Sequence, residues 1–197
     1  MTPAPALYYV VGASGVGKDS LMRYARSRIG DRLPVVFAHR YITRTPYPDD
    51  ENFISLSPAE FGMRKQAGAF VLDWASHGLQ YAIGAEINFW LAMGLAVVVN
   101  GSRGHLLPAL DTYPNMTIVW ITARSEIIAA RLAARGRESA ADIAARLERN
   151  PAPALPHRAC RALRTIDNSG ALEVAGEAFV ALLSERRLAT PGRAARA

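Results

Sequence analysis

The stretch that decides the fold of this chain is Gly12-Ala13-Ser14-Gly15-Val16-Gly17-Lys18-Asp19-Ser20. An apolar run, residues 6–11, comes before it, and an amphipathic segment, residues 21–29, comes after it. This order predicts a strand, a glycine-rich turn and a helix. The spacing of Gly, four residues and Gly-Lys in that setting is typical of a loop whose backbone N–H groups bind phosphate. We therefore predict that residues 12–20 bind the phosphates of a nucleotide, with Lys18 reaching the β- and γ-phosphates.

The last position of this loop departs from the usual pattern. A Ser or Thr normally places its hydroxyl on Mg²⁺ there, but this chain has Asp19, and Ser20 follows one residue later. A hard cation prefers carboxylate oxygen, so Asp19 can serve the metal instead. A negative residue in the first turn of a helix is also favourable by itself. The residues leave both roles open.

The composition fits one globular domain with a sizeable core. The chain has 197 residues, of which 50% are hydrophobic and 20% charged. A single cysteine, Cys160, excludes a disulfide framework within the chain, which fits a reducing cytoplasm. The first five residues lack the basic start of a signal peptide, and no apolar run approaches the ~20 residues of a membrane span. We expect a cytoplasmic protein that does not bind membranes.

The formal net charge of +6 has three explanations. It can serve nucleic-acid binding, it can be a solvated basic surface, or it can serve a heavily phosphorylated substrate. We favour the third, because many arginines lie where a kinase would need them, and no alternation of aromatic and basic residues supports nucleic-acid binding. Small molecules are therefore the expected partners, and the oligomeric state stays open, with a homodimer as one option.

Apolar runs and amphipathic segments alternate along the chain. We predict parallel strands at residues 7–11, 35–38, 95–99, 116–122 and 163–166, and a β pair at 69–76 and 79–83. Helices are expected at 18–29, 58–67, 85–93, 125–135, 140–149 and 172–187, and a polar loop at 39–52. This alternation predicts an α/β fold, a parallel sheet between two layers of helices, with ligands bound at the carboxyl ends of the strands.

Two groups of arginines stand out beyond the loop. Arg131, Arg135 and Arg137 surround a glycine break between two helical segments, which is typical of a hinged lid, although a solvated helical face would look similar. Arg40 and Arg44 flank Tyr41 just after a short strand. Their guanidinium groups suit a second anionic ligand, whereas an ordinary polar loop is the alternative.

Four strings carry a resemblance to a known family: GKDSL at 17–21, HRYITR at 39–44, VNGSR at 99–103 and RGRE at 135–138. In this order they resemble the guanylate-kinase-like P-loop kinases, and within them the ribose 1,5-bisphosphate phosphokinases, over residues 6–187. The resemblance implies a P-loop NTPase fold with a core (6–33, 95–124 and 151–187), an acceptor-binding insert (34–94), an arginine-rich lid (125–150) and a mobile tail (188–197). It also implies ATP with Mg²⁺ as donor and ribose 1,5-bisphosphate as acceptor.

The resemblance implies roles for individual residues. Arg44 matches the acceptor-phosphate arginine of guanylate kinases, and Tyr81 matches their phosphate-binding tyrosine. Asn168 lies in the segment that flanks the donor adenine, and Asp73 matches the base-binding acid, which could instead hold a ribose hydroxyl. Lys18 and the lid residues Arg135 and Arg137 would act on the transferring phosphate.

Other positions depart from guanylate kinase. Tyr47 replaces a second arginine, Phe53 replaces a phosphate tyrosine, and Ile83 replaces a guanine-binding hydroxyl. An unpaired purine edge beside Ile83 would cost roughly 1–3 kcal/mol per buried group, which disfavours guanine and fits a ligand without a base.

The strand-end acid of guanylate kinase is missing too, because Asn100 and Ser102 occupy that turn. Its loss leads us to the hypothesis that the metal-binding carboxylate has moved to Asp19. We expect Asn100, Ser102 and Arg103 to contact substrate. Guanylate kinase proper and a non-catalytic interaction module of the same family remain the alternatives.

Overall fold

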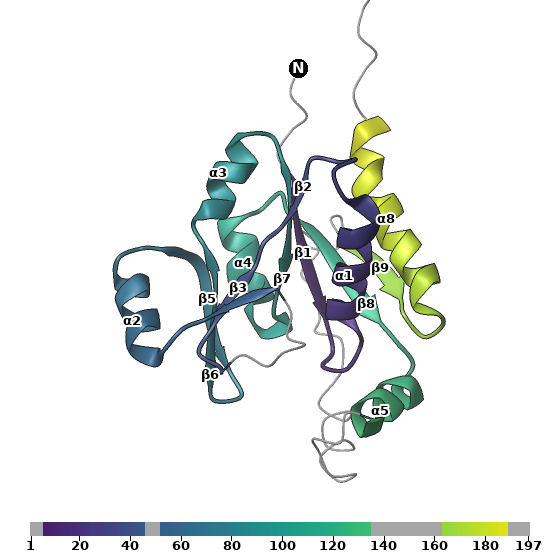
Figure 1. Ribbon diagram of the computed structural model, residues 1–197, viewed down its shortest axis with the longest axis horizontal. Helices are drawn as coiled ribbons and strands as arrows, with labels where there is room; N and C mark the ends of the chain where they lie inside the picture. Colours follow the sequence, from purple (N-terminus) through teal and green to yellow (C-terminus); the bar gives the residue numbers. More distant parts are fainter. Residues whose placement is uncertain (1–5, 46–51, 135–162, 189–197) are drawn as a thin grey trace, which may run out of the picture.

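The computed structural model describes residues 6–45, 52–134 and 163–188. Its main sheet has five parallel strands in the order β2-β7-β1-β8-β9 (Figure 1). The strands are β1 (Ala6–Gly12), β2 (Val35–Phe37), β7 (Ala96–Asn100), β8 (Thr117–Thr122) and β9 (Leu163–Asp167). The phosphate-loop sequence follows β1 at the centre of the sheet, so the loop lies between the carboxyl ends of its neighbours, where ligands bind in such folds.

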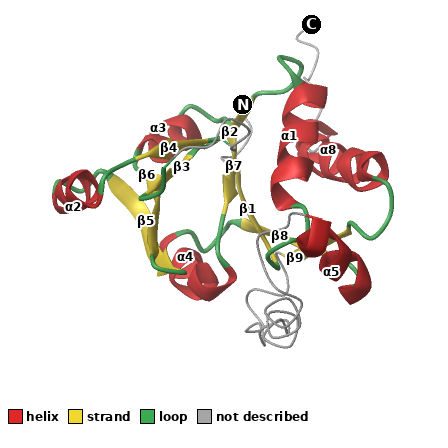
Figure 2. Cartoon of the chain, turned by 60° about the horizontal axis from the view of Figure 1, so that its bottom comes forward, coloured by secondary structure: helices red, strands yellow, loops and turns green. Residues whose placement is uncertain are grey.

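Alternating side chains of β1 build a core on each face of the sheet. Tyr8 and Val10 pack on one face with α1 (Lys18–Ile29) and α8 (Leu172–Leu188). Tyr9, with Leu7 and Val11, packs on the other face with α3 (Glu86–Ala92) and α4 (Leu106–Thr112). Figure 2 shows these two helix layers on opposite sides of the sheet. The predicted three-layer α/β architecture is thus confirmed.

A second, four-stranded sheet has the order β4-β3-β6-β5. Its strands are β3 (Arg40–Ile42), β4 (Phe53–Ser55), β5 (Phe70–Ser76) and β6 (Leu79–Gly84), and α2 (Pro58–Gln66) covers it. The side chain of Ser57 caps α2 by accepting the Glu60 N–H at 3.1 Å. A small separate core of Leu56, Phe61 and Ala82 joins α2 to this sheet.

The predicted polar loop at 39–52 is wrong for residues 40–42, which form β3. Ile42 is fully buried and pairs with Tyr81 of β6. Burial and pairing with β6 stabilise the strand, although its basic residues made the sequence look like a polar loop. Strand β2, which falls within the range predicted for the acceptor-binding insert, pairs with β7 in the main sheet. The short η1 helix (Arg103–His105) and α4 were not predicted.

Part of the predicted lid lies outside the described residues. Helix α5 (Ser125–Ala134) forms the first part of the predicted arginine-rich segment. Arg135, Arg137 and the rest of residues 135–162 are not among those described, and neither is the tail at 189–197. Within the described ranges, no helix combines the length and apolar character that crossing a bilayer requires.

Candidate active site

The loop after β1 folds tightly around the lysine that ends its motif. The Lys18 amine donates to the carbonyl oxygens of Gly12 and Ala13, at 3.0 and 3.1 Å. Gly15 and Gly17 adopt φ of 83° and 92°, a region that favours glycine. A Cβ on Gly17 would also lie 2.5 Å from the side-chain nitrogen of Asn168. These contacts explain why the loop needs glycine at both positions.

A buried asparagine holds the backbone of the phosphate loop in place. The Asn168 Nδ2 donates to the Val16 carbonyl at 2.8 Å, and the side chain is only 1% exposed. Arg131 of α5 donates to the same carbonyl at 3.2 Å. We predicted Asn168 as a nucleotide contact, but its side chain lies beneath the loop, where it positions the backbone. Arg131 was noted among the lid arginines but not predicted to reach the loop.

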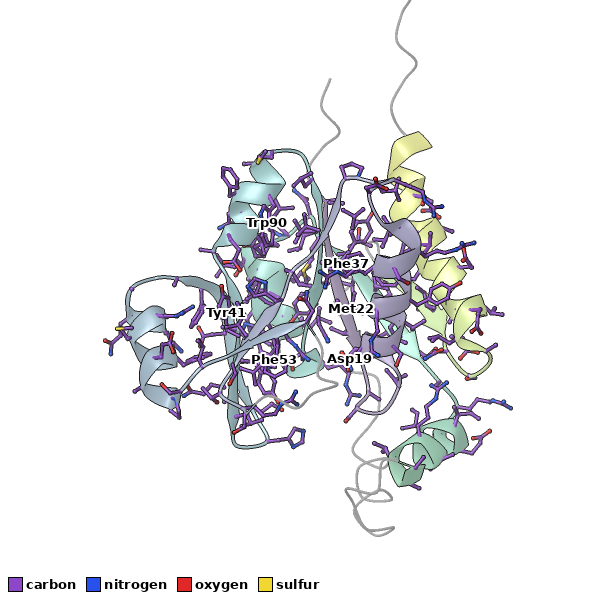
Figure 3. All side chains as sticks on the ribbon, viewed as in Figure 1. Asp19, Met22, Phe37, Tyr41, Phe53 and Trp90 are labelled. Carbon is purple, nitrogen blue, oxygen red and sulfur yellow. The ribbon has the colours of Figure 1, made fainter. Side chains whose placement is uncertain are left out.

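Asp19 and Asn100 form a polar pair between two elements. Asn100 ends β7 and donates its Nδ2 to the Asp19 Oδ1 at 2.5 Å. The Asn100 side chain is 5% exposed, and its Oδ1 has no hydrogen-bond partner among the described residues. Figure 3 shows Asp19 and Met22 on α1, which with Phe37 line a smaller cavity of about 260 Å³ beside this pair. A carboxylate and a buried amide side chain thus lie together at the loop.

A larger cavity, of about 650 Å³, brings the loop together with both other predicted segments. Its lining consists of Gly12, Ser14, Gly15, Gly17, Lys18 and Asp19 from the loop, Arg40, Arg44, Tyr81 and residues 74–77 from the second sheet region, and residues 101–105 after β7. Three predicted arginines, Arg40, Arg44 and Arg103, therefore share one cavity with Lys18. This concentration of cations suits phosphorylated ligands.

The turn after β7 is held by a buried tyrosine. The Tyr9 hydroxyl accepts from the Ser102 N–H at 3.1 Å and donates to the Ser102 carbonyl at 3.2 Å. Burial raises the pKa of Tyr9 to about 12, and the backbone hydrogen bond to Ser102 lowers it in part. Gly101 lies against the Tyr9 ring, so that a Cβ there would be 2.2 Å from ring carbon Cζ. Tyr9 therefore holds the backbone that carries Ser102 and Arg103 in place.

We expect Gly101→Ala to lower the melting temperature by roughly 3–10 °C, because an overpacked core position typically costs about 1–3 kcal/mol. Gly104→Ala is the matched control on the same turn, since its Cβ would meet only the Ser102 Oγ, at 3.8 Å. Thermal unfolding of both variants measures the difference. Equal melting temperatures for the two variants would contradict the close approach to Tyr9.

Aromatic rings order the wall of the cavity opposite the loop. The Arg44 guanidinium lies 4.8 Å from the centre of the Phe53 ring, and that of Arg40 lies 5.7 Å from the Tyr81 ring. Phe53, which lacks the hydroxyl expected in a guanylate kinase, therefore supports an arginine instead. Trp74 stacks on Tyr81 at 5.6 Å with an interplanar angle of 4°.

Two basic groups close this wall near the main sheet. Burial lowers the pKa of Arg103. Burial also lowers the pKa of His105, and the negative charge of Asp73 opposes that shift. His105 stacks on Trp74 with ring centres 5.6 Å apart. Trp74, His77 and His105 line the cavity but were not predicted as site residues, because no motif in the sequence links them to the phosphate loop.

Other predicted residues lie away from the cavity. The Tyr41 hydroxyl donates to Glu86 at 3.4 Å, and the Asp73 carboxylate on β5 pairs with Lys65 of α2. Ala13 and Val16 are buried, so the loop presents them through their backbone only, and Ser20 is exposed on α1. Tyr41 and Asp73 do not line the large cavity, and the substrate contacts predicted for them remain predictions.

Comparison with known proteins identifies the family. The chain is 51% identical over 180 residues to ribose 1,5-bisphosphate phosphokinase PhnN of Burkholderia pseudomallei, covering 91% of this chain and 96% of that protein. The chain belongs to the ribose 1,5-bisphosphate phosphokinase family. A second member, from Thiobacillus denitrificans, is 49% identical over 179 residues, covering 91% of this chain and 93% of the relative. The resemblance predicted from the GKDSL and VNGSR strings is therefore confirmed.

Members of this phosphokinase family differ in length. The Laribacter hongkongensis member is 52% identical over 183 residues, which cover 93% of this chain but only 43% of that longer protein. Guanylate kinase from Anaplasma phagocytophilum shares the fold, with a TM-score of 0.70, 12% identity and coverage of 96% of this chain and 90% of that one. This likeness confirms the P-loop NTPase fold. No family model matches the chain.

Proposed function

We propose that this protein transfers the γ-phosphoryl group of ATP to the 1-phosphate of α-D-ribose 1,5-bisphosphate. The products are 5-phospho-α-D-ribose 1-diphosphate and ADP. The observation that carries the proposal is the shared cavity, in which Arg40, Arg44 and Arg103 face the same space as the loop of Lys18. Relatives named ribose 1,5-bisphosphate phosphokinase PhnN support this acceptor.

The nucleophile in this reaction is an oxygen of the acceptor 1-phosphate. It forms a bond to the γ-phosphorus of ATP while the bond from that phosphorus to the β,γ-bridging oxygen breaks. A phosphate monoester has a second pKa near ~6, so it is already largely ionised at neutral pH. The site therefore needs no general base, and catalysis depends on positioning and on neutralising charge.

Each charged group has a separate task in this proposal. Lys18 exchanges its contacts with the Gly12 and Ala13 carbonyls for the donor phosphates. Arg44 and Arg40 hold the acceptor phosphate, supported by the rings of Phe53 and Tyr81. The lid residues Arg135 and Arg137, which lie outside the described residues, would close on the transferring group.

The pair of Asp19 and Asn100 fits a magnesium site. The Asn100 Nδ2 donates to the Asp19 carboxylate, and the buried Asn100 Oδ1 has no hydrogen-bond partner among the described residues. Carboxylate and amide oxygens are ligands that suit Mg²⁺. The described residues include no cluster of three or more His, Cys, Asp or Glu able to hold a metal. That fits Mg²⁺ bound through one or two protein groups and the substrate phosphates. When bound, the ion would neutralise charge on the β- and γ-phosphates.

An acceptor panel tests the proposed function. The protein is incubated with ATP, Mg²⁺ and either ribose 1,5-bisphosphate or GMP, and ADP release is followed together with phosphorus NMR of the product. We expect turnover of the bisphosphate and a kcat/KM for GMP at least about 100-fold lower. The reason is that Ile83 stands where guanylate kinases place a guanine-binding hydroxyl, but it is buried against Leu72 and does not line the large cavity. The position therefore supplies no hydrogen bond to a purine. Efficient GMP turnover without a diphosphoribosyl product would establish a guanylate kinase instead.

A further inference from the structure

The groups of the cavity that can bind an anion belong to two separate structural elements. Arg40 and Arg44 belong to β3 and the residues just after it, in the second sheet. Arg103 and His105 belong to the turn after β7, in the main sheet. All four line one cavity with the phosphate loop. A substrate that presented a single phosphate to this wall would need only one of the two sets.

The second set has a rigid support. Both the N–H and the carbonyl of Ser102 bond to the buried Tyr9 hydroxyl, and the Gly101 N–H donates to the Val10 carbonyl at 2.8 Å. Groups held in place before binding lose less freedom when the ligand arrives, so they contribute more to affinity. The turn therefore presents Arg103 from a backbone that is already ordered.

The backbone N–H of His105 donates to the Ser102 carbonyl at 3.2 Å, and its ring is positioned by stacking. Its ring stacks on Trp74, Trp74 stacks on Tyr81, and Arg40 lies over the Tyr81 ring. Arg40 and His105 thus occupy opposite ends of a stack that contains two rings between them. Because stacking uses the faces of the imidazole, its nitrogens remain at the ring edge, where they can bond to a ligand.

We propose that Arg103 and His105 form a second anion-binding position, which binds the 5-phosphate of the acceptor while Arg40 and Arg44 hold the 1-phosphate. This inference rests on the proposed function and adds the residues that distinguish a sugar bisphosphate from a sugar monophosphate. The guanidinium fork of Arg103 matches two phosphate oxygens. Because Arg103 is half-buried, its hydrogen bonds to an anion are stronger than they would be in open water.

Two acceptors that differ only in the 5-phosphate test this assignment. The kcat/KM for ribose 1,5-bisphosphate and for ribose 1-phosphate is measured with the wild type, Arg103→Met and His105→Asn. We expect each substitution to lower the value for the bisphosphate by about 10- to 100-fold, and the value for ribose 1-phosphate by less than about threefold. Arg44→Met should lower both values. Where ribose 1-phosphate is not turned over, its inhibition constant against the bisphosphate gives the same comparison.

Arg164→Met is the matched control, because Arg164 is exposed on β9, away from the cavity lining. It should change neither value, and thermal unfolding checks that all variants are folded. Equal losses for the two acceptors in Arg103→Met and His105→Asn, or an unchanged preference for the bisphosphate, would overturn the assignment. A wild type that phosphorylates GMP but binds neither ribose phosphate would overturn the proposed function itself, and this inference with it.

Discussion

Lys18→Ala is expected to lower kcat about 1000-fold while the fold survives. The amine lies within the loop, where it bonds to two carbonyl oxygens of residues 12 and 13, so it needs only a short movement to reach phosphate oxygens. Charge on the transferring group increases toward the transition state, and a fixed cation there stabilises it more than it stabilises the substrate. Steady-state ADP release with ribose 1,5-bisphosphate as acceptor measures the loss.

Lys65→Ala is the matched control for this prediction, because Lys18 and Lys65 are the two lysines of the chain. The Lys65 amine pairs with Asp73 on the second sheet and does not line the large cavity. We expect this variant to keep kcat within about threefold of the wild type, since exposed ion pairs contribute little. A Lys18→Ala protein that turns over at the wild-type rate would disprove the role of the loop lysine.

Asp19→Ala is expected to lower kcat by about 100-fold and to raise the Mg²⁺ concentration for half-maximal activity at least about tenfold. The physical reason is the loss of the loop carboxylate that accepts a hydrogen bond from the buried Asn100 side chain. Asp19→Ser restores the hydroxyl usual in such loops but not the negative charge. Because the turn after β7 has Asn100 and Ser102 in place of acids, we expect Asp19→Ser to be impaired as well.

Titration of activity with Mg²⁺ at saturating ATP distinguishes a metal role from a capping role. A residue that only capped α1 would change stability and leave the Mg²⁺ dependence as it was. Asp31→Asn, in the exposed turn beyond the other end of α1, is the control for loss of a carboxylate away from the phosphate loop. Should Asp19→Ser keep both the activity and the Mg²⁺ dependence of the wild type, the proposed relocation of the metal-binding acid would be wrong.

The predicted exclusion of guanine depends on a single position, Ile83. Ile83 in place of a hydroxyl was visible in the chain alone, and it predicted an acceptor without a base. The structure adds that the Ile83 side chain belongs to the core between the second sheet and the main sheet, together with Leu72. A single hydroxyl introduced there would face apolar neighbours, so the substitution Ile83→Thr by itself is not expected to create a guanine site.

The sequence by itself determined the phosphate loop, the alternation of strands and helices, and the family. These features depend on residues that are neighbours in the chain, where glycine spacing and apolar periodicity act directly on local conformation. Strand β3 was not predicted. It has only three residues, one of them an arginine, so it shows no recognisable apolar alternation, and its stability comes from pairing with β6.

Only the tertiary structure decided which side chains support the loop and the turn beside it. Asn168 reaches Val16 across 152 positions of the chain, Tyr9 reaches Ser102 across 93, and Asn100 reaches Asp19 across 81. Each contact exists because parallel strands that are distant in sequence end at the same edge of the sheet. The order of the strands, which no local pattern encodes, therefore determined that Asn168 lies beneath the loop and that His105 joins the cavity wall.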